Sequence, residues 1–95
     1  MRKKSVLPKA TAAEPIGRYR LRIKFSDGRS GEWDFSWLAG DKRPMTAPFK
    51  DPAFFDRVFL EMGALTWPNG YDCCPDSLYE DMVEAGALMS AKAAE

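Results

Sequence analysis

The chain of 95 residues has no histidine and only two cysteines, the adjacent Cys73 and Cys74. Without histidine it lacks the commonest general base and metal ligand, and neither thiol has an imidazole to activate it. Two adjacent thiols without a second pair of ligands do not make a zinc site, and a disulfide between neighbours is strained and rare. We therefore expect two reduced cysteines, no catalytic residues, no metal and no cofactor.

Long hydrophobic stretches are also missing. No apolar run approaches the roughly 20 residues that a membrane-spanning helix needs. The N-terminus begins with Met1-Arg2-Lys3-Lys4 but lacks the apolar stretch of a secretory signal. We therefore expect a cytoplasmic protein with no membrane partner. Its length, with 45% apolar and 13% aromatic residues, predicts one small domain over residues 1–95 whose core needs most of the aromatic side chains.

The net charge is zero, but the charges are unevenly distributed along the chain. Residues 1–24 hold eight Lys or Arg and one Glu, which gives +7. Residues 25–50 are balanced, whereas residues 51–95 hold nine Asp or Glu and two Lys or Arg, which gives −7. Such asymmetry is typical of a basic arm that binds nucleic acid, and equally of two ends that neutralise each other in the fold.

The strictest pattern is a strand over residues 19–25, in which apolar side chains alternate with cationic ones. A three-residue turn, Ser26-Asp27-Gly28, places Gly28 where a left-handed conformation is wanted and leads into a second strand over residues 31–35. This register puts apolar side chains on one face and opposite charges on the other. It pairs Tyr19 with Phe35, Leu21 with Trp33, Arg20 with Asp34, and Arg22 with Glu32.

Further elements follow from helix starts and turns. Residues 36–39 suggest one helical turn capped by Asp34 or Ser36, followed by a surface loop over 40–44. Asp51-Pro52 is a helix start, and the helix over 53–56 must be short because residues 57–61 are strand-like. With a turn at Met62-Gly63, the return strand over 64–67 forms a second hairpin that pairs Leu60 with Leu65 and Val58 with Trp67.

The stretch Trp67-Pro68-Asn69-Gly70-Tyr71-Asp72 combines a large aromatic anchor, a strand stop and a tight turn. Pro75 then opens a helix with one apolar stripe, and Gly86 is a plausible stop. The stripe consists of Leu78, Tyr79, Met82 and Val83. Residues 1–15 are expected to form a partly ordered arm, and residues 87–95 a frayed tail.

Together these elements predict an α+β domain. Its small antiparallel sheet is built from two β-hairpins, with a short helix between them and a C-terminal helix packed on one face.

The chain resembles the DUF2442 family of small bacterial proteins. The most specific match is Trp67-Pro68-Asn69-Gly70-Tyr71-Asp72 followed by Pro75-Asp76-Ser77-Leu78-Tyr79, and the similarity begins at about Tyr19. The resemblance implies a small α+β domain, which in some relatives precedes a helix-turn-helix domain and in many belongs to a toxin–antitoxin-like gene pair. Because 16 residues follow Tyr79, we expect no such second domain here. The family offers no established catalytic residues to carry over.

The favoured hypothesis is a non-enzymatic protein-binding module. Its partner would be a neighbouring gene's product or another copy of the chain, and its role antitoxin-like or regulatory. Trp37 and Trp67 lie at element ends, where a half-exposed ring can anchor an interface. The candidate interface residues are Trp37, Trp67, Asn69, Asp72 and Tyr79. Packing in the core is the competing interpretation for both tryptophans.

Two other functions remain open. The first is a nucleic-acid-binding regulator that uses the N-terminal arm and the basic strand over residues 18–24. Its candidate contacts are Arg18, Arg20, Arg22 and Lys24, although the facing acids Glu32 and Asp34 favour a solvated, neutralised surface. The second is a small-molecule or enzymatic site near Asp72 and Trp67, weighed against Asp72 as an ordinary turn residue.

Overall fold

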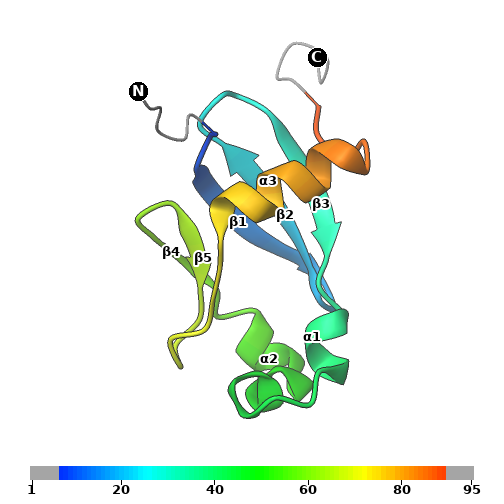
Figure 1. The fold of residues 1–95 in the computed structure, drawn as a ribbon. Coiled ribbons are helices and arrows are strands. Elements are labelled where there is room, and N and C mark those ends of the chain that lie inside the picture. The colour runs from blue at the N-terminus through cyan, green and yellow to red at the C-terminus, as the bar shows by residue number, and fades with distance from the viewer. Residues whose placement is uncertain (1–6, 90–95) are drawn as a thin grey trace.

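The computed structural model of the chain describes residues 7–89, which form a small α+β domain (Figure 1). The elements in chain order are β1 (Ala10–Gly17), β2 (Arg20–Phe25), β3 (Ser30–Asp34), α1 (Trp37–Gly40), the 3-10 helix η1 (Pro44–Lys50), α2 (Pro52–Phe55), β4 (Phe59–Glu61), β5 (Ala64–Thr66), β6 (Asp72–Cys73) and α3 (Pro75–Glu84). The predicted α+β class is confirmed. The strands, however, form two antiparallel sheets, β1-β2-β3 and β4-β5-β6, where the sequence predicted a single sheet.

The predicted register of the first hairpin is confirmed. Leu21 lies opposite Trp33, and Arg20 and Arg22 lie opposite Asp34 and Glu32. The β2 side chains alternate strictly between buried and exposed, and Gly28 has the left-handed conformation (φ +90°) that the three-residue turn requires. Alternation on a half-buried strand was therefore enough to fix both its faces and its partner.

The expectation of a partly ordered arm over residues 1–15 is wrong from Ala10 onward, and residues 1–6 lie outside the described range. Ala10–Gly17 is a strand that pairs with β2 along its length, with irregularities at Ala10/Ala12 and Pro15/Gly17. Only Ala10 on this strand is fully buried. Backbone hydrogen bonds hold an edge strand of this kind, so its sequence needs no apolar alternation and tolerates a proline.

The short helices lie together at one end of the molecule (Figure 1). The Asp34 carboxylate accepts a hydrogen bond from the Ser36 backbone N–H (2.7 Å) just before α1, and the Asp51 carboxylate accepts one from the Ala53 N–H (3.0 Å) in α2. Both helix starts agree with the prediction. The 3-10 helix η1, which buries Thr46 and Phe49, was not predicted.

The second hairpin forms as predicted at its centre, where Leu60 pairs with Leu65. Val58 and Trp67 lie beyond the ends of the paired strands. A third strand was missed: β6 has only two residues, Asp72 and Cys73, which pair with Thr66 and Leu65. A backbone hydrogen bond from Ala10 N to Gly63 O (3.0 Å) joins the two sheets.

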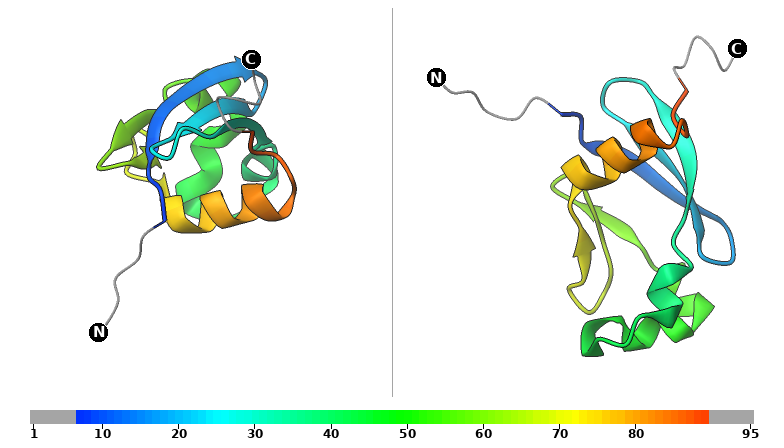
Figure 2. Two further views of the ribbon diagram at one scale, coloured as in Figure 1. Left: turned by 90° about the horizontal axis from the view of Figure 1, so that it is seen from above. Right: turned by 45° about the vertical axis from the view of Figure 1, so that its right-hand side comes forward.

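Helix α3 covers one face of the first sheet, as the view from above shows (Figure 2). The Tyr79 ring meets that of Phe25 edge-on at 5.0 Å between centroids, and Leu78 and Met82 are buried on the same side. The helix ends at Glu84, and Gly86, two residues later, has a left-handed conformation (φ +72°) and donates its N–H to Val83 O, as expected for a glycine stop. No helix within residues 7–89 is long and apolar enough to cross a membrane.

The expected frayed tail over residues 87–95 is partly corrected. Met89 exchanges two backbone hydrogen bonds of 2.9 Å with Ser30, so the chain returns to the edge of β3 after α3. A Cβ atom on Gly31 would stand 2.1 Å from the Ala87 carbonyl oxygen, so only glycine allows this close approach. Residues 90–95 lie outside the described range.

Candidate functional site

A groove of about 420 Å³ lies between two walls, one from β3 and α1 and the other from β6 and α3. We call it the Trp37 groove. Its lining combines aromatic rings, carboxylates and a thiol-bearing turn: Trp33, Asp34, Phe35, Trp37, Tyr71, Asp72, Cys73, Cys74, Ser77, Leu78 and Asp81. Two of the five candidate interface residues, Trp37 and Asp72, thus line the same groove although they lie 35 positions apart in the sequence.

Trp37 is the most exposed aromatic residue among those that line the groove. It begins α1, directly after the turn that Asp34 caps, and half of its surface (50%) remains accessible. The next residue, Leu38, is fully buried and fixes the helical turn to the core. Because the backbone is anchored on both sides, the exposed ring is presented by a rigid support, as in an interface anchor.

The opposite wall carries acidic side chains. Asp72 lies on β6 and is exposed, and Asp81 is exposed on α3. Ser77 and Leu78 lie between them on the first turns of the helix, which starts with Pro75. Pairing of β6 with β5 fixes Asp72, and the packing of α3 on the sheet fixes Asp81. The groove therefore has two tryptophan rings and Asp34 on the side of β3 and α1, and two further carboxylates, Asp72 and Asp81, on the side of β6 and α3.

The two cysteines at the join of β6 and α3 have opposite properties. Burial raises the pKa of the Cys73 thiol to about 11. Cys74 is exposed, and hydrogen bonds from the backbone N–H groups of Ser77 and Asp76 lower its pKa. Both are free thiols, as the sequence predicted. At neutral pH Cys74 is the more reactive of the two, because the thiolate is the nucleophile.

Trp67 does not line the groove. It is fully buried, and its indole N–H donates to the Phe55 carbonyl oxygen (2.8 Å). Its ring is surrounded by those of Phe35, Phe49, Phe55 and Tyr71, with centroids 5.0–6.4 Å away. The competing interpretation of Trp67 as a core residue is therefore correct, and its candidacy for an exposed interface is wrong.

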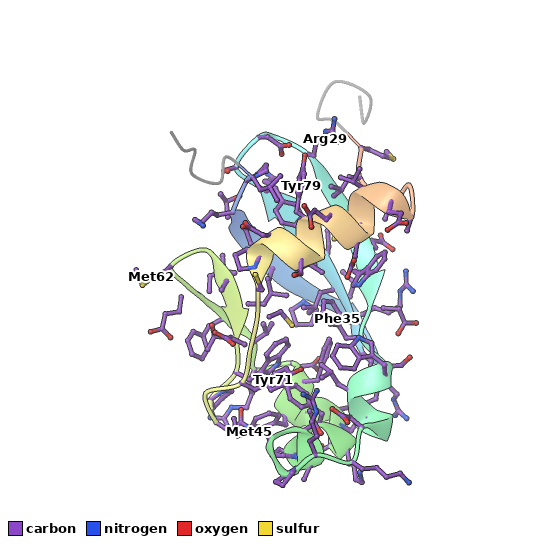
Figure 3. All side chains as sticks on the ribbon, viewed as in Figure 1. Arg29, Phe35, Met45, Met62, Tyr71 and Tyr79 are labelled. Atoms are coloured by element: carbon purple, nitrogen blue, oxygen red, sulfur yellow. The ribbon has the colours of Figure 1, made fainter. Side chains whose placement is uncertain are left out.

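Asn69 and Tyr79 also have structural partners. The Asn69 side chain donates to the Met45 carbonyl oxygen (2.9 Å) and accepts from the Tyr71 N–H (3.1 Å), which ties the turn to η1. The Tyr79 hydroxyl donates to the Asp27 carboxylate (2.6 Å), and the ring points from α3 toward the β2–β3 turn (Figure 3). Neither residue lines the Trp37 groove.

Two of the four cations predicted as nucleic-acid contacts, Arg20 and Arg22, are paired with acids. Arg22 lies within 3.1 Å of Glu32 and 3.6 Å of Glu14, so acids on both neighbouring strands face it. Arg20 lies 3.3 Å from Glu32 and 3.8 Å from Asp34. Lys24 extends from the same face of β2 without an ion pair among the described residues, and Arg18 is exposed in the β1–β2 turn.

Most of the groove residues were not singled out from the sequence. Cys74, Leu78 and Asp81 follow the spacing i, i+4, i+7, which places them on one side of α3, and this stripe is the signal that was available. The facing wall gave no such signal, because the proximity of β3 and α3 is tertiary. Within residues 7–89 no three acidic, cysteine or histidine side chains are placed to hold a metal ion.

Comparisons with known proteins give one match. The family model described as "Protein of unknown function (DUF2442)" matches residues 10–84, from the start of β1 to the end of α3, and thus includes every residue of the groove. No curated protein and no solved structure matches the chain. Because the match covers well over half of the 95 residues, the chain belongs to the DUF2442 family.

Proposed function

We propose that this protein is a non-enzymatic protein-binding module and that its partner docks in the Trp37 groove. The observation that carries the proposal is the half-exposed Trp37 ring, held on a buried helical turn in a hollow with Asp72. Tryptophan is enriched among the residues that dominate binding energy at protein interfaces, because a rigid ring buries much area at little entropic cost. Packing against other side chains of the fold leaves half of this ring uncovered.

The partner we expect is the product of a neighbouring gene, with this chain in an antitoxin-like or regulatory role in the bacterial cytoplasm. The family resemblance motivates that part of the proposal. A second copy of the chain is the other protein partner that the groove would accept.

Nucleic-acid binding ranks lower. Binding to phosphates needs cations that are free to replace counterions, whereas Arg20 and Arg22 are already paired with Glu14, Glu32 and Asp34. A small-molecule site near Asp72 ranks third. The groove volume of about 420 Å³ lies in the usual range of ligand pockets, roughly 300–1,000 Å³. Its open position between an exposed ring and exposed acids favours a partner surface instead.

The proposal is tested by co-expressing the tagged chain with the product of the adjacent gene and measuring the affinity of the purified pair calorimetrically. Trp37→Ala should weaken the complex by about 30-fold or more, the effect of removing an anchor residue. Phe59→Ala is the matched control, because Phe59 is similarly exposed (45%) but lies on β4, away from the groove.

The control should keep its affinity within about twofold. Absence of a complex, or equal losses in the two variants, would refute the groove as the binding site. A mobility shift of mixed DNA at low salt, lost in Arg20→Glu/Arg22→Glu, would instead favour the nucleic-acid alternative.

A further inference from the structure

The chemistry of the groove walls restricts what kind of side chain can occupy it. The wall from β3 and α1 presents the rings of Trp33 and Trp37 together with Asp34, which Arg20 approaches at 3.8 Å, and the other wall presents the exposed carboxylates of Asp72 and Asp81. Leu78 contributes an apolar surface between them. An occupant must therefore offer apolar area to the rings and neutralise, or at least not repel, the carboxylates.

The cations near the groove do not neutralise this acidic wall. Asp72 and Asp81 form no ion pair among the described residues, and no lysine or arginine lines the groove. Arg20 lies 3.8 Å from Asp34 on the aromatic side, and Arg43, next to Tyr71, is held by Asp41 at 2.6 Å.

Lys9 shares a second hollow of about 390 Å³ with Asp72, but the two side chains form no ion pair. The groove thus keeps two uncompensated negative charges facing two indole rings.

We infer that the groove selects a cationic side chain, and arginine before lysine, from a segment of the partner protein. This inference rests on the proposed function and adds the chemistry of the partner. A guanidinium stacks on an indole face through cation–π attraction, while its planar fork donates to a carboxylate and its methylene stem covers apolar surface. An aromatic wall facing unpaired acids matches each of these three parts.

The choice of partner follows from charge complementarity. An acidic or phosphorylated segment would place like charges against Asp72 and Asp81, and an apolar segment would leave both carboxylates partly desolvated and unpaired. Within this chain, Arg20 and Arg22 of β2 already pair with Glu14, Glu32 and Asp34. A basic segment of the partner protein is therefore the occupant that the charges favour over an acidic or an apolar one.

The test uses the full chain and two capped peptides, acetyl-Ser-Leu-Arg-Leu-Ser-amide and the same peptide with citrulline, the neutral isostere of arginine. Binding is followed by NMR at the indole N–H signals of Trp33 and Trp37. Trp67 is an internal reference, because its N–H is buried and bonded to Phe55. The arginine peptide should bind about tenfold more tightly than the citrulline peptide, as one desolvated cation–π contact with a nearby carboxylate predicts.

Variants assign this difference to the acidic wall. Asp72→Asn/Asp81→Asn should abolish the preference for arginine, and Trp37→Ala should remove binding of both peptides. Glu80→Gln is the matched control, because Glu80 is exposed on α3 next to Asp81 but does not line the groove. It should keep the full preference. Raising the salt concentration should weaken binding of the arginine peptide and leave binding of the citrulline peptide unchanged.

The outcomes separate the inference from the function on which it rests. Equal binding of both peptides at Trp37, or no shift at about 10 mM peptide, well above a Kd of about 1 mM, would overturn the selection of a cation. The groove would still be the binding site of the partner if Trp37→Ala weakens the binding of the neighbouring gene's product. If Trp37 signals shift with protein concentration alone, a second copy is the occupant and the inference fails. Unaltered affinity of the neighbouring protein for Trp37→Ala would overturn the groove as the partner's binding site.

Discussion

Trp67 and Trp37 occupy neighbouring parts of the molecule in opposite environments. Trp67 is fully buried, its N–H satisfied by Phe55, whereas half of the Trp37 surface is accessible. The two regions share Phe35 and Tyr71, which contact the Trp67 ring and also line the groove. The Trp67 motif, the clearest motif of the sequence, thus builds the core beneath the groove. The exposed surface of the groove comes from residues such as Trp37 and Asp72, which belong to separate segments of the chain.

The largest loss of stability is expected from truncating Trp67, the buried ring beneath the groove. Trp67→Ala should lower the free energy of unfolding by about 3–5 kcal/mol, the range for truncating a buried aromatic residue. Since a domain of this size has roughly 5–10 kcal/mol in total, the variant should be marginally folded at 37 °C. Trp37→Ala should lower stability by less than about 1 kcal/mol. Urea denaturation followed by far-UV circular dichroism measures the free energy of unfolding of both variants. Similar losses in the two variants would show that Trp37 and Trp67 do not differ in their contribution to the core.

A smaller loss of stability is expected from substituting Gly31 on β3, where the segment after α3 packs closely against the strand. In Gly31→Ala the new methyl group would meet the Ala87 carbonyl oxygen at 2.1 Å, so the segment after α3 must move, at about 1–3 kcal/mol. Gly40→Ala is the control, because nothing lies within 4 Å of its added Cβ atom and its φ is not in the left-handed region. Thermal unfolding compares the two. A Gly31→Ala variant as stable as Gly40→Ala would show that the close approach is not needed.

The Tyr79–Asp27 hydrogen bond joins α3 to the β2–β3 turn, and Tyr79→Phe should cost about 1–2 kcal/mol. Burial raises the pKa of Asp27, but the hydrogen bonds from Tyr79 and the Arg29 N–H outweigh it, so that pKa lies below 3.8. The contribution of this carboxylate is therefore present above about pH 4 and lost as the pH falls through the lowered pKa. The hydrogen bond to Asp27, with burial, raises the pKa of Tyr79 above 10.

The contribution of the Tyr79 hydroxyl is accordingly present below about pH 10 and lost as the pH rises through the raised pKa. The stability difference between the native chain and Tyr79→Phe should stay level between about pH 5 and 9 and shrink outside that window. Urea midpoints measured across the pH range check this. A difference that grows in acid would contradict the assigned hydrogen bond.

The smallest perturbation is a chemical one that leaves the fold intact. Iodoacetamide should alkylate Cys74 in the groove before Cys73, because the Cys74 thiol is exposed with a lowered pKa and the Cys73 pKa is about 11. The rate for Cys74 should reach half its maximum below the ordinary thiol pKa of 9.0. Peptide mapping by mass spectrometry, with Cys74→Ser as the control, distinguishes the sites. Equal rates would place both thiols in one environment.

How much of this the sequence predicted depends on whether local or tertiary contacts decide each feature. The β2–β3 register followed from alternation and charge pairing, and Asp51-Pro52 and Pro75 marked two helix starts. Strand β1 escaped prediction because backbone pairing holds it, and β6 because two residues carry no periodic pattern. Trp37 and Asp72 were both named as candidates, but only the packing of α3 beside β3 brings them into one groove.

We propose that a partner protein occupies the Trp37 groove, and the rate of Cys74 alkylation shows whether it does. Cys74 lines the groove and provides a reactive probe without any mutation. The rate should be measured on the folded chain, free and with a saturating concentration of the neighbouring gene's product. We expect the bound partner to slow the reaction at least about tenfold, because it covers an accessible thiolate. An unchanged rate in a complex shown to be fully formed would contradict the proposal.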